Sequence, residues 1–95
     1  MKIHAITWLE EIVNKIRVKH NVDTWEVKEV FGNSPRITFV AKGHQPDEDL
    51  YLALGQSDEG RYLAVLFLYK ISKKALIITA RNMTHKERRR YDRKR

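Results

Sequence analysis

Residue types suited to phosphate chemistry gather at the end of the chain. Positions 81–95 hold eight Lys and Arg residues against two acidic ones, whereas the first eighty hold eleven basic residues against ten acidic. The net charge of +7 is therefore local. Such a cluster attracts polyanions and speeds encounter with them. Two interpretations follow, a solubilising tail or a protein that handles nucleic acid.

Arg81 is the first candidate within this cluster. A β-rich run ends there, and a helix signal begins three residues later. A strand end that leads into a helix start presents side chains and backbone N–H groups to a phosphate. The planar guanidinium can clamp that phosphate with two hydrogen bonds. A surface salt bridge is the alternative for Arg81 taken alone.

The final helix is predicted to begin at Thr84, because Thr84 and Glu87 form a capping box. Helical spacing places four basic residues on one broad face, as candidate RNA contacts or as a solvated face: Lys86, Arg89, Arg90 and Arg93. Glu87 is either only the cap, or it also acts as a general base or orients one of the arginines. Tyr91 either packs on the sheet or stacks on a base.

Lys19 and His20 follow the first predicted helix. Histidine is the side chain best suited to proton transfer near neutral pH, although a surface or helix-end role is the alternative. The other histidines lack the paired spacing of a metal site, and the chain has no cysteine. Glycine-rich phosphate loops and nucleophile elbows are also absent from the sequence, so we expect no metal and no cofactor.

The elements that must position these residues follow from hydrophobic periodicity. We expect strands at 2–7, 36–42, 50–54, 61–69 and 75–80, and helices from Trp8 to His20–Asn21, from Asp23 to a stop at 32–35, and from Thr84 onward. Asn21 can end the first helix in the left-handed conformation, and Asp23 and Glu26 form the capping pattern that starts the second. The second helix should bury Trp25, Val27, Val30 and Phe31, and Ile37, Phe39 and Ala41 should share one strand face. The near-continuous apolar run 61–69 indicates a central strand covered on both faces.

The fold class is therefore α+β. We expect two N-terminal helices and a C-terminal helix packed on a curved antiparallel sheet of about four strands, in a single domain over 1–95 whose residues 93–95 fray. The longest apolar run, eight residues, is too short to span a bilayer, for which roughly 20 are needed. The N-terminal residues lack the long apolar stretch of a signal peptide, so we expect a soluble cytoplasmic protein.

Several segments together resemble the BrnT family of bacterial toxins, a branch of the RelE-like toxins. They are the Trp8 helix ending in Lys19–His20, Glu29–Phe31, Ala53–Gly55, Gly60–Val65, and an ending of the form A-R-x-x-T-x-x-E-R-x-x-Y at 80–91. The resemblance covers roughly residues 6 to 92, and its last two segments are the most specific.

This resemblance implies a metal-independent endoribonuclease that inhibits translation. It also implies a BrnA-like antitoxin partner with a ribbon-helix-helix region, assembled as a heterotetramer. Cleavage by a 2′-hydroxyl needs a base, an acid and cations for the phosphate. By matching position, Arg61 and Arg81 are expected to stabilise the phosphate, and Lys19, His20 and Glu87 to transfer protons or position RNA. Two alternatives remain open: a non-catalytic nucleic-acid-binding module, and an inactive member that binds only its protein partner.

Overall fold

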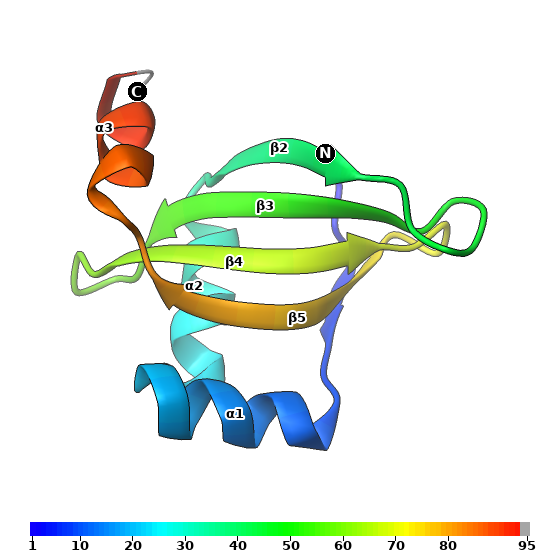
Figure 1. Ribbon diagram of the computed structural model, residues 1–95, viewed down its shortest axis with the longest axis horizontal. Coiled ribbons are helices and arrows are strands. Elements are labelled where there is room, and N and C mark those ends of the chain that lie inside the picture. Colours follow the sequence, from blue (N-terminus) through cyan, green and yellow to red (C-terminus); the bar gives the residue numbers. More distant parts are fainter. Residues whose placement is uncertain (94–95) are drawn as a thin grey trace.

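The computed structural model of the 95-residue chain describes residues 1–93. The elements follow the predicted order and are β1 (Ala5–Thr7), α1 (Glu10–His20), α2 (Thr24–Gly32), β2 (Arg36–Ala41), β3 (Asp49–Gln56), β4 (Tyr62–Tyr69), β5 (Lys74–Asn82) and α3 (His85–Arg93). Figure 1 shows a curved sheet with α1 and α2 against one face and α3 rising from one end. The chain has the expected α+β architecture. Arg93 is the last residue of α3, and the fraying predicted for 94 and 95 lies outside the described residues.

The sheet has five strands in the order β1-β5-β4-β3-β2. Neighbouring strands are antiparallel except β1, which pairs with β5 in parallel. A parallel neighbour needs a long crossover, and here everything from α1 to β4 supplies it. The strand β4 is central, as predicted. Coverage of both its faces was predicted wrongly: Leu66 and Leu68 stay half-buried, because α3 covers the second face only at one end.

The main core lies between the two N-terminal helices and the sheet. Its fully buried members are Ile16, Val22, Val27 and Val30 from the helical layer and Ala53, Leu63, Val65, Phe67, Ala75, Ile77 and Ala80 from the strands. Burial of apolar surface is worth roughly 25 cal/mol per Å². This layer therefore fixes how α1 and α2 sit on the strands that carry the candidate residues.

Both helix boundaries between α1 and α2 were predicted from local signals, and both are confirmed. Asn21 adopts the left-handed conformation at φ 53°, and its N–H donates to the Arg17 carbonyl at 3.1 Å. Asp23 and Glu26 form the capping box that starts α2. The connection is short, and the backbone N–H groups of Asn21, Val22 and Asp23 all donate hydrogen bonds, which fixes how α2 follows α1.

Two predicted faces were wrong. Trp25 is 49% exposed, and Glu26 takes the inward position on α2 because a basic side chain pairs with it there. Ile37 and Phe39 do share one face, but a bulge between Phe39 and Ala41 moves Ala41 to the other, and Phe39 is 55% exposed because β2 is the edge strand. In both cases tertiary surroundings override the local pattern.

The final helix starts as predicted. The Glu87 N–H donates to the Thr84 hydroxyl at 3.1 Å, and the Thr84 N–H donates to the Glu87 carboxylate at 2.9 Å. Only two residues separate β5 from α3, so the end of the strand determines the position of the first turn of the helix. None of the three helices within residues 1–93 has the length and apolarity needed to cross a bilayer.

Substitution of Gly55 would test how closely α2 approaches β3. A Cβ at Gly55 would lie 2.9 Å from Val30 Cγ1 and 3.2 Å from Pro35 Cβ, whereas one at Gly32 meets nothing within 4 Å. We expect Gly55→Ala to lower the unfolding free energy by about 1–3 kcal/mol through overpacking. Gly32→Ala should stay within about 1 kcal/mol of the wild type. Urea denaturation measures both, and equal effects would contradict the close approach.

Candidate functional site

The candidate residues meet at one end of the sheet, where β4 begins and β5 ends. Residues from three parts of the chain form a continuous series of hydrogen bonds there. The series runs from His20 through Arg61, Asn82 and Arg81 to Glu87. The structure therefore brings together four of the five residues expected to act on RNA, and Lys19 lies beside His20 on the exposed end of α1.

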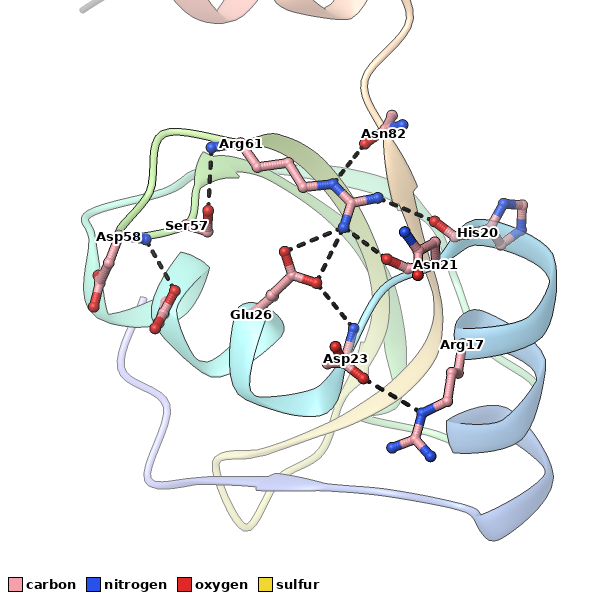
Figure 2. A network of polar contacts seen from close by, with 10 residues as sticks. Arg17, His20, Asn21, Asp23, Glu26, Ser57, Asp58, Arg61 and Asn82 are labelled. Atoms are coloured by element: carbon pink, nitrogen blue, oxygen red, sulfur yellow. Dashed lines mark hydrogen bonds and ion pairs between the residues drawn. The ribbon is translucent and has the colours of Figure 1, made fainter.

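Arg61 is held by hydrogen bonds from all three of its guanidinium nitrogens (Figure 2). Nη1 donates to the Asn21 carbonyl at 2.7 Å and to both Glu26 oxygens at 3.0 and 3.1 Å. Nη2 donates to the His20 carbonyl at 3.0 Å, and Nε donates to Asn82 Oδ1 at 2.9 Å. A guanidinium with its donors occupied in this way is fixed in place and has little capacity left for a phosphate.

The Arg61 network joins the α1–α2 connection to the sheet. Carbonyls at the end of α1 lack partners within the helix, and a cation there also interacts favourably with the helix dipole. Glu26 is only 8% exposed and carries a charge that needs a partner. The network supplies that partner and satisfies the two carbonyls of His20 and Asn21. Arg61 thereby sets where Lys19 and His20 lie.

Glu26 and Asn82 were missed as site residues from the sequence. Glu26 was assigned only a capping role, and it does accept the Asp23 N–H at 3.0 Å. Its second role depends on Arg61, which lies 35 residues later in the chain. The one sequence signal for Asn82 was its place directly after Arg81, which says nothing about a contact with Arg61.

Arg81 lies on the opposite face of the sheet from Arg61. Strand side chains alternate, so Asn82 faces the α1–α2 side while Arg81 faces α3. Arg81 and Glu87 form a two-pronged pair, with Nη1 to Oε1 at 2.7 Å and Nη2 to Oε2 at 2.9 Å. Glu87 also completes the cap at Thr84. Glu87 thus both caps α3 and orients an arginine, the two roles that the sequence left as alternatives.

The pair has a clear electrostatic state. Hydrogen bonds from Arg81, together with the Thr84 N–H, hold the pKa of Glu87 below its ordinary value, despite partial burial. The carboxylate in turn raises the pKa of Arg81. At neutral pH Glu87 is an anion and Arg81 a cation. The pair therefore holds two fixed opposite charges at the point where β5 leads into α3.

His20 and Lys19 differ in their surroundings. His20 is half-buried and holds Arg61 through its backbone carbonyl, while its imidazole ring points away from that guanidinium (Figure 2). Lys19 is exposed. Both side chains are therefore available to a ligand that lies across the end of α1.

The basic residues of α3 divide into two groups. Lys86, Arg89 and Arg90 are exposed, as expected for a face that meets a polyanion, and so is Arg93. Arg88 lies over the Tyr62 ring at 3.9 Å from its centroid. Tyr91 is only 5% exposed and packs with Leu54 and Ala64. Its ring is not available for stacking on a base, so the packing alternative for Tyr91 is confirmed.

Comparisons with known proteins agree with this architecture. The profile of the family "Ribonuclease toxin, BrnT, of type II toxin-antitoxin system" matches residues 8–87. The crystal structure of the Brucella abortus ribonuclease toxin BrnT superposes with a TM-score of 0.63 at 19% sequence identity, covering 85% of this chain and 97% of that one. At that identity the structural likeness shows the fold alone. A search of curated proteins found no match.

The Arg61–Glu26 pair is expected to contribute cooperatively to stability. Arg61→Ala or Glu26→Ala alone should cost about 3 kcal/mol of unfolding free energy, because each leaves a mostly buried charge unpaired. The double variant should cost clearly less than the sum. The control is Arg17→Ala, which removes an exposed pair with Asp23 and should cost less than about 1 kcal/mol. Additive losses in the double-mutant cycle would show that the two side chains are not coupled.

The Glu87 carboxylate predicts a pH-dependent contribution to stability. A depressed pKa stabilises the folded state above the unfolded pKa, and the benefit disappears as pH falls through the folded value. Glu87→Gln keeps an acceptor for Thr84 but loses the charge that faces Arg81. We expect the wild type to exceed this variant by about 1 kcal/mol at pH 7, a modest value because Arg81 is partly exposed.

The gap between wild type and Glu87→Gln should close under acid conditions, below the ordinary pKa of the carboxyl. Chemical denaturation at a series of pH values measures it. Asp92→Asn is the control, since its exposed 3.9 Å contact with Arg88 should give no comparable gap. A difference that is independent of pH would contradict the ionic role of Glu87.

Proposed function

The chain belongs to the BrnT family of ribonuclease toxins of type II toxin–antitoxin systems, and on that premise we propose that the β4–β5 end of the sheet is its RNA-cleaving site. The observation that supports this placement is the series of contacts from His20 to Glu87. It gathers fixed cations and titratable groups beside an exposed basic helix. The cleavage we propose needs no metal ion and inhibits translation.

Arg81 is the phosphate-stabilising residue in this proposal. Its side chain is 37% exposed, whereas that of Glu87 is 13% exposed. The carboxylate therefore holds the guanidinium from the inner side while the outer edge stays open to RNA. A cation fixed in this way stabilises the charge that develops on the pentavalent phosphate without reorganisation during the reaction. Arg61 acts differently, by holding the end of α1 in place.

The reaction class sets the remaining roles. A base removes the proton from a 2′-hydroxyl, whose oxygen attacks the adjacent phosphorus; the bond to the 5′-oxygen breaks, and an acid protonates that oxygen. The products are a 2′,3′-cyclic phosphate and a 5′-hydroxyl. We assign proton transfer to His20 and Lys19, because the ionised Glu87 is unsuited to it. Glu87 positions Arg81.

The exposed face of α3 binds the RNA backbone beyond the cleaved phosphate. Lys86, Arg89 and Arg90 are exposed and lie one short helix from Arg81. Contacts of this kind are sequence-independent and weaken steeply with salt. Because RNA in translation is the target, we propose that the protein acts in the cytoplasm. The family description implies an antitoxin, for which we propose a ribbon-helix-helix protein that binds the toxin in a heterotetramer.

Cleavage of single-stranded RNA in EDTA at low salt tests the proposal. Arg81→Ala should lower kcat/KM by about a hundredfold or more, because a fixed transition-state donor is lost. Arg17→Ala is the control: Arg17 is also a surface arginine but has no proposed role in cleavage, so its kcat/KM should equal that of the wild type. Analysis of the product ends should find the cyclic phosphate.

Other outcomes of the same experiment distinguish the alternatives. Tight, salt-sensitive RNA binding without cleavage would favour a non-catalytic nucleic-acid-binding module. Equal cleavage by the wild type and Arg81→Ala would remove Arg81 from the mechanism. Activity that EDTA abolishes would overturn the metal-independent part of the proposal.

A further inference from the structure

One aromatic ring on the α3 face is positioned for a ligand. Tyr62 begins β4, and its ring meets the buried Tyr91 ring edge to face, with centroids 5.9 Å apart and planes at 88°. That contact fixes the plane of the Tyr62 ring. The Arg88 guanidinium lies 3.9 Å from the ring centroid. Aromatic rings and guanidinium planes are the two surfaces on which RNA-binding proteins stack unpaired bases.

A cavity of about 310 Å³ opens beside this ring. Its lining residues come from the start of β4, the end of β5 and the first turn of α3: Tyr62, Asn82, Met83, Thr84, His85 and Arg88. Two of these elements, β5 and α3, also carry the Arg81–Glu87 pair. The cavity therefore lies at the same end of the sheet as the proposed site of cleavage.

Sheet register places Tyr62 and Arg81 as neighbours on one face. Arg81 is paired with Ala64, and Tyr62 lies two residues before Ala64 on the same face. The Met83 N–H donates to the Tyr62 carbonyl at 3.1 Å, so the register continues to this point. The Cα atoms of diagonal neighbours of this kind lie roughly 7–8 Å apart, within reach of long and aromatic side chains. A nucleotide whose phosphate contacts Arg81 can therefore set its base against Tyr62.

The polar groups of the cavity are mainly donors. Arg88 can only donate. Thr84 accepts from the Glu87 N–H, which leaves its hydroxyl proton to donate, whereas the Asn82 side chain is turned toward Arg61 on the other face. A donor-rich pocket complements a base edge made of acceptors. Guanine has two adjacent acceptors, O6 and N7, and an arginine fork matches them with two hydrogen bonds.

Resting on the proposed function, we propose that the Tyr62 cavity is a guanine-binding subsite adjacent to the cleaved phosphate, with Tyr62 as the stacking surface and Arg88 as the specificity-determining residue. The Arg88 side chain can move from the Tyr62 ring to the base, because it is 56% exposed and its ion pair with Asp92 is long at 3.9 Å. On binding, the guanidinium leaves the Tyr62 ring and meets the O6 and N7 edge. The base takes its place over the ring.

The test uses 2′-O-methyl oligonucleotides, which cannot be cleaved by 2′-hydroxyl attack. Each carries one G, U, A or C between abasic positions, and fluorescence anisotropy at fixed low salt gives Kd. We expect G to bind about tenfold more tightly than A or C, as one bidentate contact permits. Replacing G with 7-deazaguanine, which lacks the N7 acceptor, should remove most of that advantage.

Variants separate the two roles in the subsite. Arg88→Ala should bring G to the affinity of A, whereas the matched Arg89→Ala, on the same helix, should weaken all four bases by the same factor. Tyr62→Phe should keep the preference, and Tyr62→Leu should weaken binding of every base. Arg88 is exposed, so its variant remains informative even if Tyr62→Leu is unstable.

Two failures are distinguishable. Equal Kd values for the four bases, or a preference that survives Arg88→Ala, would overturn the subsite and leave the Arg88–Tyr62 contact as packing of α3. Base preference in the absence of any RNA cleavage would retain the subsite while removing the catalytic function, because binding is measured on RNA that cannot react.

Discussion

The arrangement depends on the ion pair between Arg61 and Glu26. One guanidinium, with each of its nitrogens bonded, holds the last carbonyls of α1, the first turn of α2 and the end of β5 together. Without it, Glu26 would be a nearly buried charge with no counterion, and the end of α1 would keep unsatisfied carbonyls. The apolar core sets the distance between the helices and the sheet, and this pair sets their register at the end where the candidate residues lie.

A second arginine–glutamate pair lies across the sheet from the first. Arg81 and Glu87 fasten α3 to β5, and Asn82 touches both arginines, through its side chain on one face and its carbonyl on the other. The two pairs serve different ends. All three guanidinium nitrogens of Arg61 are bonded and its side chain is 26% exposed, whereas Arg81 is paired with one carboxylate and is 37% exposed. Identical residue types thus acquire different chemistry from their surroundings.

Sequence patterns predicted the local features well. The left-handed Asn21, the capping boxes at Asp23 and Thr84, and the central position of β4 each follow from a few neighbouring residues or from one apolar run. The errors share a cause. Trp25 was assigned inward because it is apolar, and Ala41 was placed on the face of Phe39 by strict alternation, yet the Glu26 counterion and the bulge in the edge strand decided these positions. The sequence did not decide between packing and base stacking for Tyr91. In the structure Tyr91 packs in the core, and the neighbouring Tyr62 ring is the one that lines a cavity.

The sequence by itself determined the order of the elements, the ends of the helices, the location of the charge and the family, because these depend on residues close together in the chain or on a matching order of motifs. Only the tertiary structure decided which carboxylate pairs with each arginine. That outcome depends on partners 35 residues apart for Arg61 and on strand alternation at 81 and 82. A side chain's solvation and counterion determine what it can do, and both are set by folding.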